Sequence, residues 1–117
     1  MPVDHRQARA LRVLLEPQNP ALALQLGLQP DIEVVRDLTA RPVVALVEEV
    51  TSVPSLLEDD PECRILVLTG SAHPGLADAA LAAGAAGLIL RDGPVEDLAD
   101  AIRRASMGET VIDPSLG

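Results

Sequence analysis

The chain of 117 residues, with a mass of 12.3 kDa, is long enough for one domain with a single hydrophobic core. Eighteen acidic and nine basic residues give a net charge of −9, which repels phosphate backbones, and no Phe, Tyr or Trp is present to stack on bases. We therefore expect no direct binding of nucleic acid. No apolar run approaches the ~18 residues of a membrane span, and the N-terminus has no apolar secretory segment. These absences predict a cytoplasmic protein with no membrane partner.

Short apolar runs alternate with helix-like segments along the chain, which is the pattern of a parallel sheet covered by helices. We expect residues 1–10 to form a flexible tail and residues 11–117 to form one α/β domain. The predicted elements of the first half are strands at 11–15, 32–35 and 43–47 and a helix at 21–28.

Segment 41–50 is compatible with two structures. Its β-branched run VVALV favours a strand, yet the apolar residues Val43, Leu46, Val47 and Val50 also share one face of a helix. We interpret residues 43–47 as a strand.

The second half has clearer boundaries. RILVL at 64–68 is apolar throughout, as expected for a strand covered on both faces, and GLIL at 87–90 is a shorter strand. The last helix begins at Pro94 and ends before Gly108, with acidic residues in its first turn. The predicted helices of this half are 55–60, 73–84 and 94–108, which brings the total to five strands and four helices.

Residues 66–116 contain a distinctive series of elements. A strand ends in Thr69, a helix ends in AAGAAG, the next strand ends in the basic residue Arg91, and the proline-started helix leads into GETVIDPSL. This series resembles the second half of a response-regulator receiver domain, in particular the subfamily with a LuxR-type DNA-binding domain. The first half resembles the same family more weakly, through LRVLLEPQNPALA, PDIEVV and RPVVALVEEVTSVP.

The resemblance implies a flavodoxin-like (βα)5 fold, a doubly wound parallel sheet with strand order 2-1-3-4-5 and sites at the carboxyl ends of the strands. Only residues 36–41 link the second and third strands, which is too short for a helical crossover. The second helix is therefore expected to be deleted or shortened. We expect its loss to expose apolar sheet surface that a partner subunit covers.

A working receiver of this family holds Mg²⁺ with two acids after the first strand and with the aspartate after the third strand, which accepts the phosphoryl group. Here the acidic pair falls on Pro17 and Gln18, and Glu16 is the only acid in that loop. The phosphoacceptor position falls on Val47 without a gap, or on Glu48 with a shift of one residue. The acidic pair and the acceptor aspartate are thus absent, and we expect neither a metal nor a cofactor.

The remaining pocket positions are also altered. The threonine is kept as Thr69, the lysine is replaced by Arg91, and the aromatic switch position is Leu88. Arginine keeps the charge of lysine but presents a planar guanidinium. The family's usual dimer surface corresponds to the last two helices and the strand between them, with candidate residues Asp78, Asp97, Asp100, Arg103 and Arg104.

We interpret the chain as an atypical, degenerate receiver that works in signal transduction and transcription regulation by dimerisation, without aspartate phosphorylation. DNA contacts would belong to a C-terminal DNA-binding domain outside this chain. Two alternatives remain, namely a phosphate-accepting receiver that uses Glu48, and a small-molecule or anion-binding module that uses the turn Thr69–Ser71 with Arg91. We do not expect an enzyme, because no His lies near a Ser or Cys at the strand ends.

Overall fold

Six parallel strands form one sheet in the order β2-β1-β3-β4-β5-β6. The computed structural model describes residues 10–70 and 73–114. The strands are β1 (Leu11–Glu16), β2 (Ile32–Val35), β3 (Val44–Val47), β4 (Arg64–Thr69), β5 (Gly87–Leu90) and β6 (Val111–Ile112). The helices are α1 (Pro20–Gly27), α2 (Ser52–Asp59), α3 (Leu76–Ala83) and α4 (Val95–Ser106). The predicted flavodoxin-like order 2-1-3-4-5 is confirmed, with one additional strand.

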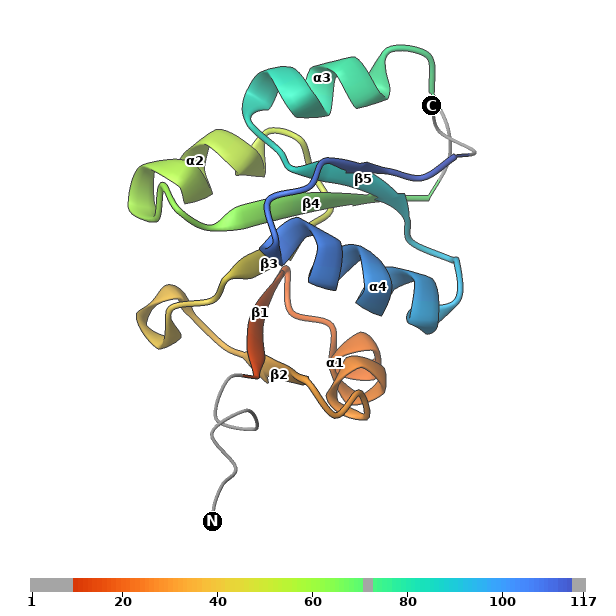
Figure 1. Ribbon diagram of the computed structural model, residues 1–117. Coiled ribbons are helices and arrows are strands. Elements are labelled where there is room, and N and C mark those ends of the chain that lie inside the picture. The colour runs from red at the N-terminus through yellow and green to blue at the C-terminus, as the bar shows by residue number, and fades with distance from the viewer. Residues whose placement is uncertain (1–9, 71–72, 115–117) are drawn as a thin grey trace.

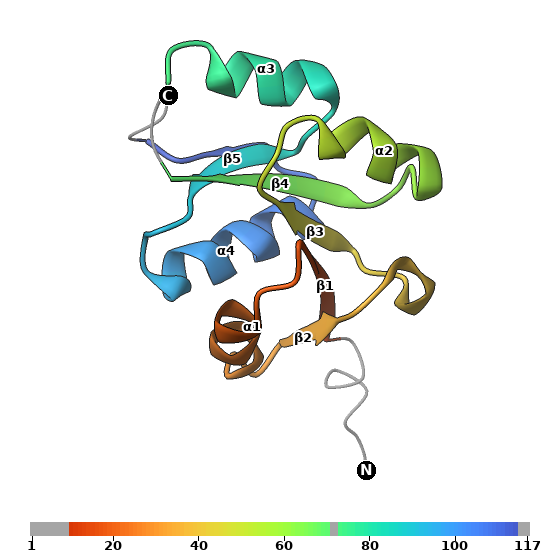
Figure 2. The same ribbon diagram turned by 180° about the vertical axis from the view of Figure 1, so that it is seen from behind.

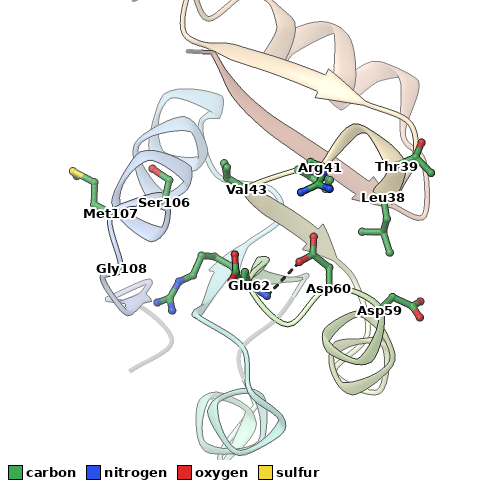
Figure 3. A pocket seen from close by; sticks show the side chains of 12 residues that line it. Leu38, Thr39, Arg41, Val43, Asp59, Asp60, Glu62, Ser106, Met107 and Gly108 are labelled. Atoms are coloured by element: carbon green, nitrogen blue, oxygen red, sulfur yellow. Dashed lines mark hydrogen bonds between the residues drawn. The ribbon is translucent and has the colours of Figure 1, made fainter. Parts of the chain in front are cut away.

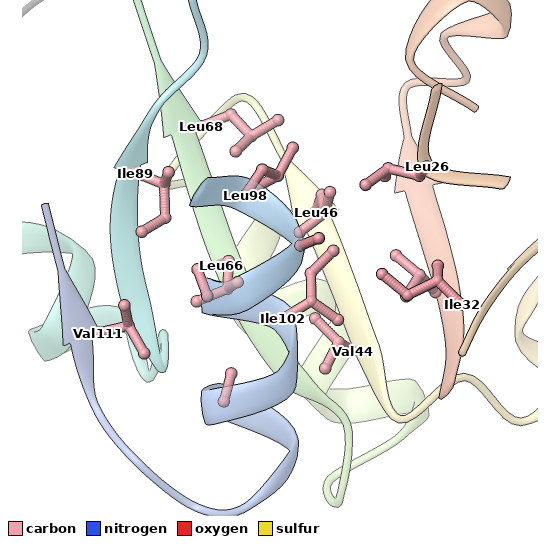
Figure 4. Packing of buried hydrophobic residues seen from close by; sticks show 14 of the residues in the cluster. Leu26, Ile32, Val44, Leu46, Leu66, Leu68, Ile89, Leu98, Ile102 and Val111 are labelled. Atoms are coloured by element: carbon pink, nitrogen blue, oxygen red, sulfur yellow. The ribbon is translucent and has the colours of Figure 1, made fainter. Parts of the chain in front are cut away.

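The helices lie in two layers, one on each face of the sheet (Figure 1, and from behind in Figure 2). Successive residues of a strand point to opposite faces, so each central strand contributes to two core clusters. On one face, α1 and α4 cover a cluster that includes Leu46 and Leu66, part of which is shown in Figure 4. On the other face, α2 and α3 cover a cluster that includes Ala45 and Val67. Within the described ranges, no helix is long and apolar enough to cross a membrane.

Two helix boundaries differ from those expected. The helix predicted at 55–60 begins at Ser52, because Pro54 is tolerated in the first turn, where no intrahelical N–H bond is needed. The helix predicted to begin at residue 73 begins at Leu76, because Gly75 has a φ of 82° and so cannot continue a right-handed helix. By contrast, α1 begins at Pro20, one residue before the predicted start, with the Asn19 side chain accepting a hydrogen bond from the Leu22 amide at 3.2 Å.

Segment 41–50 contains a strand, which confirms the interpretation of its VVALV run. The link between β2 and β3 holds only a 3-10 turn, η2 (Leu38–Ala40), so the predicted reduction of the second helix is also confirmed. The side chain of Asp37 caps this turn by accepting hydrogen bonds from the backbone N–H and the hydroxyl of Thr39, which lower the pKa of the Asp37 carboxyl.

The apolar surface expected next to this turn is only partly exposed, since Val43, beside Arg12 on this face, is 40% exposed. Arg12 and Glu33 lie side by side on the sheet face that a longer helix would cover, with 3.8 Å between their charged groups. Arg12 also donates to the Ala40 carbonyl at 3.2 Å, and the neighbouring Leu14 is only 4% exposed. Polar strand residues and a folded-back turn therefore replace part of the missing helix.

The sixth strand, β6, is absent from the sequence prediction. It pairs with the outer edge of β5, where the Val111 amide donates to the Ala86 carbonyl at 3.0 Å and the Asp113 amide donates to the Leu88 carbonyl at 2.9 Å. Gly87 lies opposite Val111, and a side chain on Gly87 would overlap the Val111 carbonyl. The glycine therefore permits the close approach of β6 to β5.

Arg103 ties α4 to the segment that precedes β2. Its Nε and Nη2 donate to both carboxylate oxygens of Asp31 at 2.8 and 3.0 Å, and Nη2 also donates to the Gln29 side chain at 2.9 Å. This fork is the strongest type of Arg–carboxylate geometry. The hydrogen bonds from Arg103 lower the pKa of the Asp31 carboxyl.

We expect Asp31→Asn to lower the free energy of unfolding by about 0.5–1 kcal/mol at neutral pH, since the pair is partly exposed to solvent. Because the folded-state pKa of Asp31 is lowered, this contribution is present above the unfolded pKa of ~3.9 and is lost as the pH falls through the folded-state pKa. The two proteins should thus converge in stability in acid. Urea unfolding, followed by far-UV circular dichroism at several pH values, measures the difference. Glu62→Gln, at an exposed carboxylate, is the charge-matched control, and an equal loss in it would contradict the assignment.

Candidate functional site

The carboxyl edge of the sheet gathers the ends of β1, β3, β4 and β5, because all strands run parallel. Glu16 is paired in register with Val47, and Thr69 is paired with Leu90. The residues that follow β3 and β5, Glu48 and Arg91, therefore leave the sheet at this same edge. The structure thus places four of the polar residues predicted for the pocket, Glu16, Glu48, Thr69 and Arg91, at one edge of the sheet.

Val47 and Glu48 were the two alternatives for the phosphoacceptor position. Val47 is fully buried, and its side chain packs in the core cluster under α2 and α3. Glu48 is half-buried, and its Oε1 lies 3.4 Å from Nη1 of Arg91. Val47 is therefore a core residue, and of the two residues Glu48 is the one with a carboxylate at this edge beside Arg91.

Arg91 lies against the turn after β4. A side chain on Gly70 would come within 2.7 Å of Nη2 of Arg91, so the guanidinium lies directly over this glycine. The backbone N–H of Arg91 donates to the Thr69 carbonyl at 2.7 Å, which fixes the start of its side chain. The Arg91 and Glu48 side chains are 45% and 31% exposed, so their ion pair is only partly shielded from water.

The loop after β1 has no metal-binding geometry. The Gln18 amide donates across to the Arg36 carbonyl at 3.4 Å, and Pro17 has no ligand atom in its side chain. Glu16 is exposed at the end of β1. Within residues 10–70 and 73–114, no group of three His, Cys, Asp or Glu residues lies close enough together to hold a metal ion. Magnesium requires several oxygen ligands, so the described residues do not fit it.

Two further pocket expectations concern Leu88 and Ser71. Leu88 is fully buried in the cluster under α2 and α3, where its side chain has no polar group to reach the edge. Ser71 lies outside the described residues.

The lone thiol, Cys63, is also buried, and this burial raises its pKa to about 12, so it is not a reactive nucleophile.

On the candidate dimer surface, both arginines already pair with acidic residues of the same chain. Arg103 pairs with Asp31, and Arg104 pairs with Glu109 through a 2.9 Å contact between Nε and Oε1. The acidic candidates are exposed on the helices, namely Asp78, Asp97 and Asp100. The strand β6 lies along the edge of β5 between these helices. This surface is therefore acidic, with its arginines already paired within the chain.

A large groove lies at the opposite edge of the sheet, near the amino ends of β3 and β4 (Figure 3). Its volume is about 860 Å³, and its walls come from η2, the turn after α2 and the end of α4. Sequence reasoning did not find it, because the lining residues belong to segments far apart in the chain. It includes none of the residues predicted for the pocket. A smaller hollow of about 360 Å³ lies between α1 and β2.

Similar proteins were found by sequence and by structure, although no protein-family model matches the chain. The chain is 35% identical over 97 residues to the "Uncharacterized transcriptional regulatory protein YvfU" of Bacillus subtilis (strain 168). This alignment covers 82% of the chain and 46% of YvfU, so the chain spans less than half of this relative.

Among solved structures, the isolated REC domain of RcsB from Salmonella enterica serovar Typhimurium, in the apo form, matches with a TM-score of 0.75. It is 21% identical, with 90% of this chain and 94% of that structure covered. A two-component response regulator of the LuxR family from Aurantimonas sp. SI85-9A1 matches with a TM-score of 0.78 and 17% identity, with 92% of each chain covered. These two likenesses establish the fold.

Proposed function

Because the chain belongs to the response-regulator family and has the fold of its receiver domain, we propose that it is an atypical receiver. It acts in signal transduction and transcription regulation through protein–protein contact, and it does not accept a phosphoryl group. The proposal includes no catalytic activity and no cofactor.

The ion pair between Glu48 and Arg91 carries this proposal. A glutamate carboxylate stands one methylene further from the backbone than an aspartate carboxylate, in the direction in which a phosphoryl group would extend an aspartate. Arg91 lies over Gly70 and meets this carboxylate at 3.4 Å. The unmodified chain therefore already contains an anion–cation contact at the place where phosphorylation would create one, and a further anion would have to compete with Glu48 for Arg91.

The loop after β1 supports the same conclusion. Phosphoryl transfer in this family needs Mg²⁺, and the residues at the positions of the acidic pair, Pro17 and Gln18, provide no carboxylate. The two alternatives, a shifted acceptor at Glu48 and an anion site at Arg91, would each need to break the existing ion pair.

The relatives' greater length supports a C-terminal DNA-binding domain outside this chain. The described domain would then regulate that domain through contacts with other protein surfaces. Direct contact of this chain with DNA is disfavoured by its net charge of −9. A homodimer fits this role, because a dimer brings two attached domains together.

A backbone-amide NMR titration with Mg²⁺ and beryllofluoride, a mimic of the phosphoryl group, tests the proposal. We expect no localised shifts at Glu48, Thr69 and Arg91 at millimolar metal. The quadruple variant Pro17→Asp/Gln18→Asp/Glu48→Asp/Arg91→Lys restores the acidic pair, the aspartate and the lysine of the family pocket and is the matched positive comparison. Localised shifts in the unmodified chain would instead show a working phosphoryl site, and shifts with inorganic phosphate alone would favour the anion-binding alternative.

A further inference from the structure

The large groove at the amino edge opens where two hydrogen-bonded strands separate. The Arg64 amide donates to the Val43 carbonyl at 2.9 Å, which joins the beginnings of β3 and β4. Ahead of this pair, one segment comes from η2 and the other from the turn after α2, and the groove of about 860 Å³ lies between them. Ligand sites in proteins measure ~300–1,000 Å³, so this groove is large enough for a molecule of several residues.

One wall of the groove presents a cation. Arg41, at the end of η2, has a φ of 57°, in the left-handed region that glycine and asparagine adopt most readily. Its backbone N–H donates to the Leu38 carbonyl at 2.9 Å, which closes the turn. Among the described residues, no carboxylate forms an ion pair with its exposed guanidinium. The fold therefore makes no use of this charge, which is available to a ligand.

The facing wall presents carboxylates from the turn after α2. They belong to Asp59, Asp60 and Glu62, none of which forms an ion pair within the described part of the chain. Oδ1 of Asp60 accepts a hydrogen bond from the Glu62 amide at 3.2 Å, which holds this carboxylate in place. The side chains of Arg41 and Asp60 lie on opposite sides of the groove (Figure 3). Opposite charges therefore line the two walls without pairing with each other.

Apolar side chains line the groove beside the charged ones. Val43 and Met107 are 40% and 69% exposed, and both contribute to its surface. The other cation, Arg64, is already engaged, because its Nε donates to the Ala105 carbonyl at 3.2 Å and its Nη2 donates to the Glu109 carbonyl at 3.4 Å. The groove thus combines one unpaired cation, several unpaired carboxylates and some apolar surface.

We propose that this groove binds short free peptides, with the ligand's carboxylate at Arg41, its ammonium group at the facing carboxylates, and an aliphatic side chain against Val43 and Met107. A zwitterion complements both walls at once, whereas a simple anion would meet the carboxylates and a simple cation would meet Arg41. The site goes beyond the proposed function, because it lies at the edge opposite to Glu48 and Arg91. It would give the domain an input that needs no phosphoryl group.

A backbone-amide NMR titration of the full chain with alanyl-leucyl-alanine tests the proposal. This peptide has an ammonium group, a carboxylate and a central aliphatic side chain. We expect saturable shifts at the amides of Arg41, Val43 and Glu62 at millimolar peptide, with weaker binding at about 0.15 M salt than at about 0.01 M. The same peptide, acetylated at its N-terminus and amidated at its C-terminus, is the matched ligand control. It lacks both charges and should bind about tenfold more weakly or worse.

Substitutions on the two walls locate the ligand. Arg41→Asn keeps a residue that tolerates a positive φ, and Asp60→Asn keeps the oxygen that accepts from the Glu62 amide, so both variants should fold. Each should weaken binding of the zwitterionic peptide by about three- to tenfold. Arg36→Asn and Asp92→Asn change exposed residues outside the groove, and these charge-matched controls should leave the dissociation constant unchanged. Amide spectra verify that each variant is folded.

Three results would overturn the proposal: no shifts in the groove at millimolar peptide, equal binding of the doubly blocked peptide, or an unchanged dissociation constant in either wall variant. Equal binding of the blocked peptide would instead indicate a site for a segment of a partner protein. None of these results would alter the beryllofluoride response of the chain, which concerns the opposite edge. The peptide site and the phosphorylation-independent function can therefore fail separately.

Discussion

Replacing Ile102 with alanine is expected to lower the free energy of unfolding by about 2–5 kcal/mol. Ile102 is fully buried on α4, and its side chain points from this helix toward Val44, Leu46 and Leu66 on the sheet (Figure 4). Removal of three carbon atoms there leaves a cavity that neighbouring aliphatic side chains fill only in part. The absence of aromatic rings makes this loss harder to compensate, since no large side chain can move into the space.

Urea unfolding followed by far-UV circular dichroism measures this effect, because the chain has no Trp or Tyr for fluorescence. Ile102→Val should cost about 0.5–1.5 kcal/mol, which makes the series graded. Met107→Ala, at a side chain that is 69% exposed, is the surface control and should change stability by less than about 0.5 kcal/mol. Equal losses at Ile102 and Met107 would contradict the packing of α4 described above.

Gly87→Ala is expected to detach β6 from the sheet and to lower the free energy of unfolding by about 1–3 kcal/mol. The new methyl group would overlap the Val111 carbonyl and would lie 3.0 Å from Cδ2 of Leu66. The backbone of β6 must move away, because the opposing side, Leu66, is itself buried in the core.

Hydrogen exchange distinguishes this local effect from global unfolding. The amides of Val111 and Asp113, which donate to Ala86 and Leu88, should exchange much faster in the variant, while those of β3 and β4 stay protected. Gly93→Ala is the matched control, because its methyl group would meet only the Leu90 carbonyl at an ordinary 3.7 Å. Unchanged exchange at Val111 would show that β6 tolerates a side chain at this position.

The elements that sequence analysis predicted well are those whose signals are local. The strand β4 is apolar throughout, and α4 has a proline at its start, acids in its first turn and a buried apolar stripe. By contrast, β6 consists of only two residues, Val111 and Ile112, and its pairing depends on the glycine opposite it in β5. A two-residue apolar run has no periodicity to recognise.

Only part of the pocket could be predicted from the sequence, because the rest depends on contacts between distant segments. The run VVALVEE allows either Val47 or Glu48 to occupy the pocket, and only the folded chain shows that Val47 is buried in the core. The partner of Arg103 was missed because Asp31 lies 72 residues away in the sequence. The Arg12–Glu33 pair was missed because the register of β1 and β2 places its members side by side. These features depend on tertiary contacts that no local pattern contains.

The parallel arrangement of all six strands also determines where a reporter group can be attached. The chain enters β1 at the amino edge of the sheet, the edge that also holds the large groove, and leaves β6 at the carboxyl edge, the edge that also holds Glu48 and Arg91. A fluorophore coupled to a cysteine at position 10 therefore senses events at the first edge, and one at position 114 senses events at the second. The native thiol of Cys63, with its pKa raised to about 12 by burial, will not compete for such labels. Ligand-induced signals at the two edges can thus be recorded independently on the same small domain.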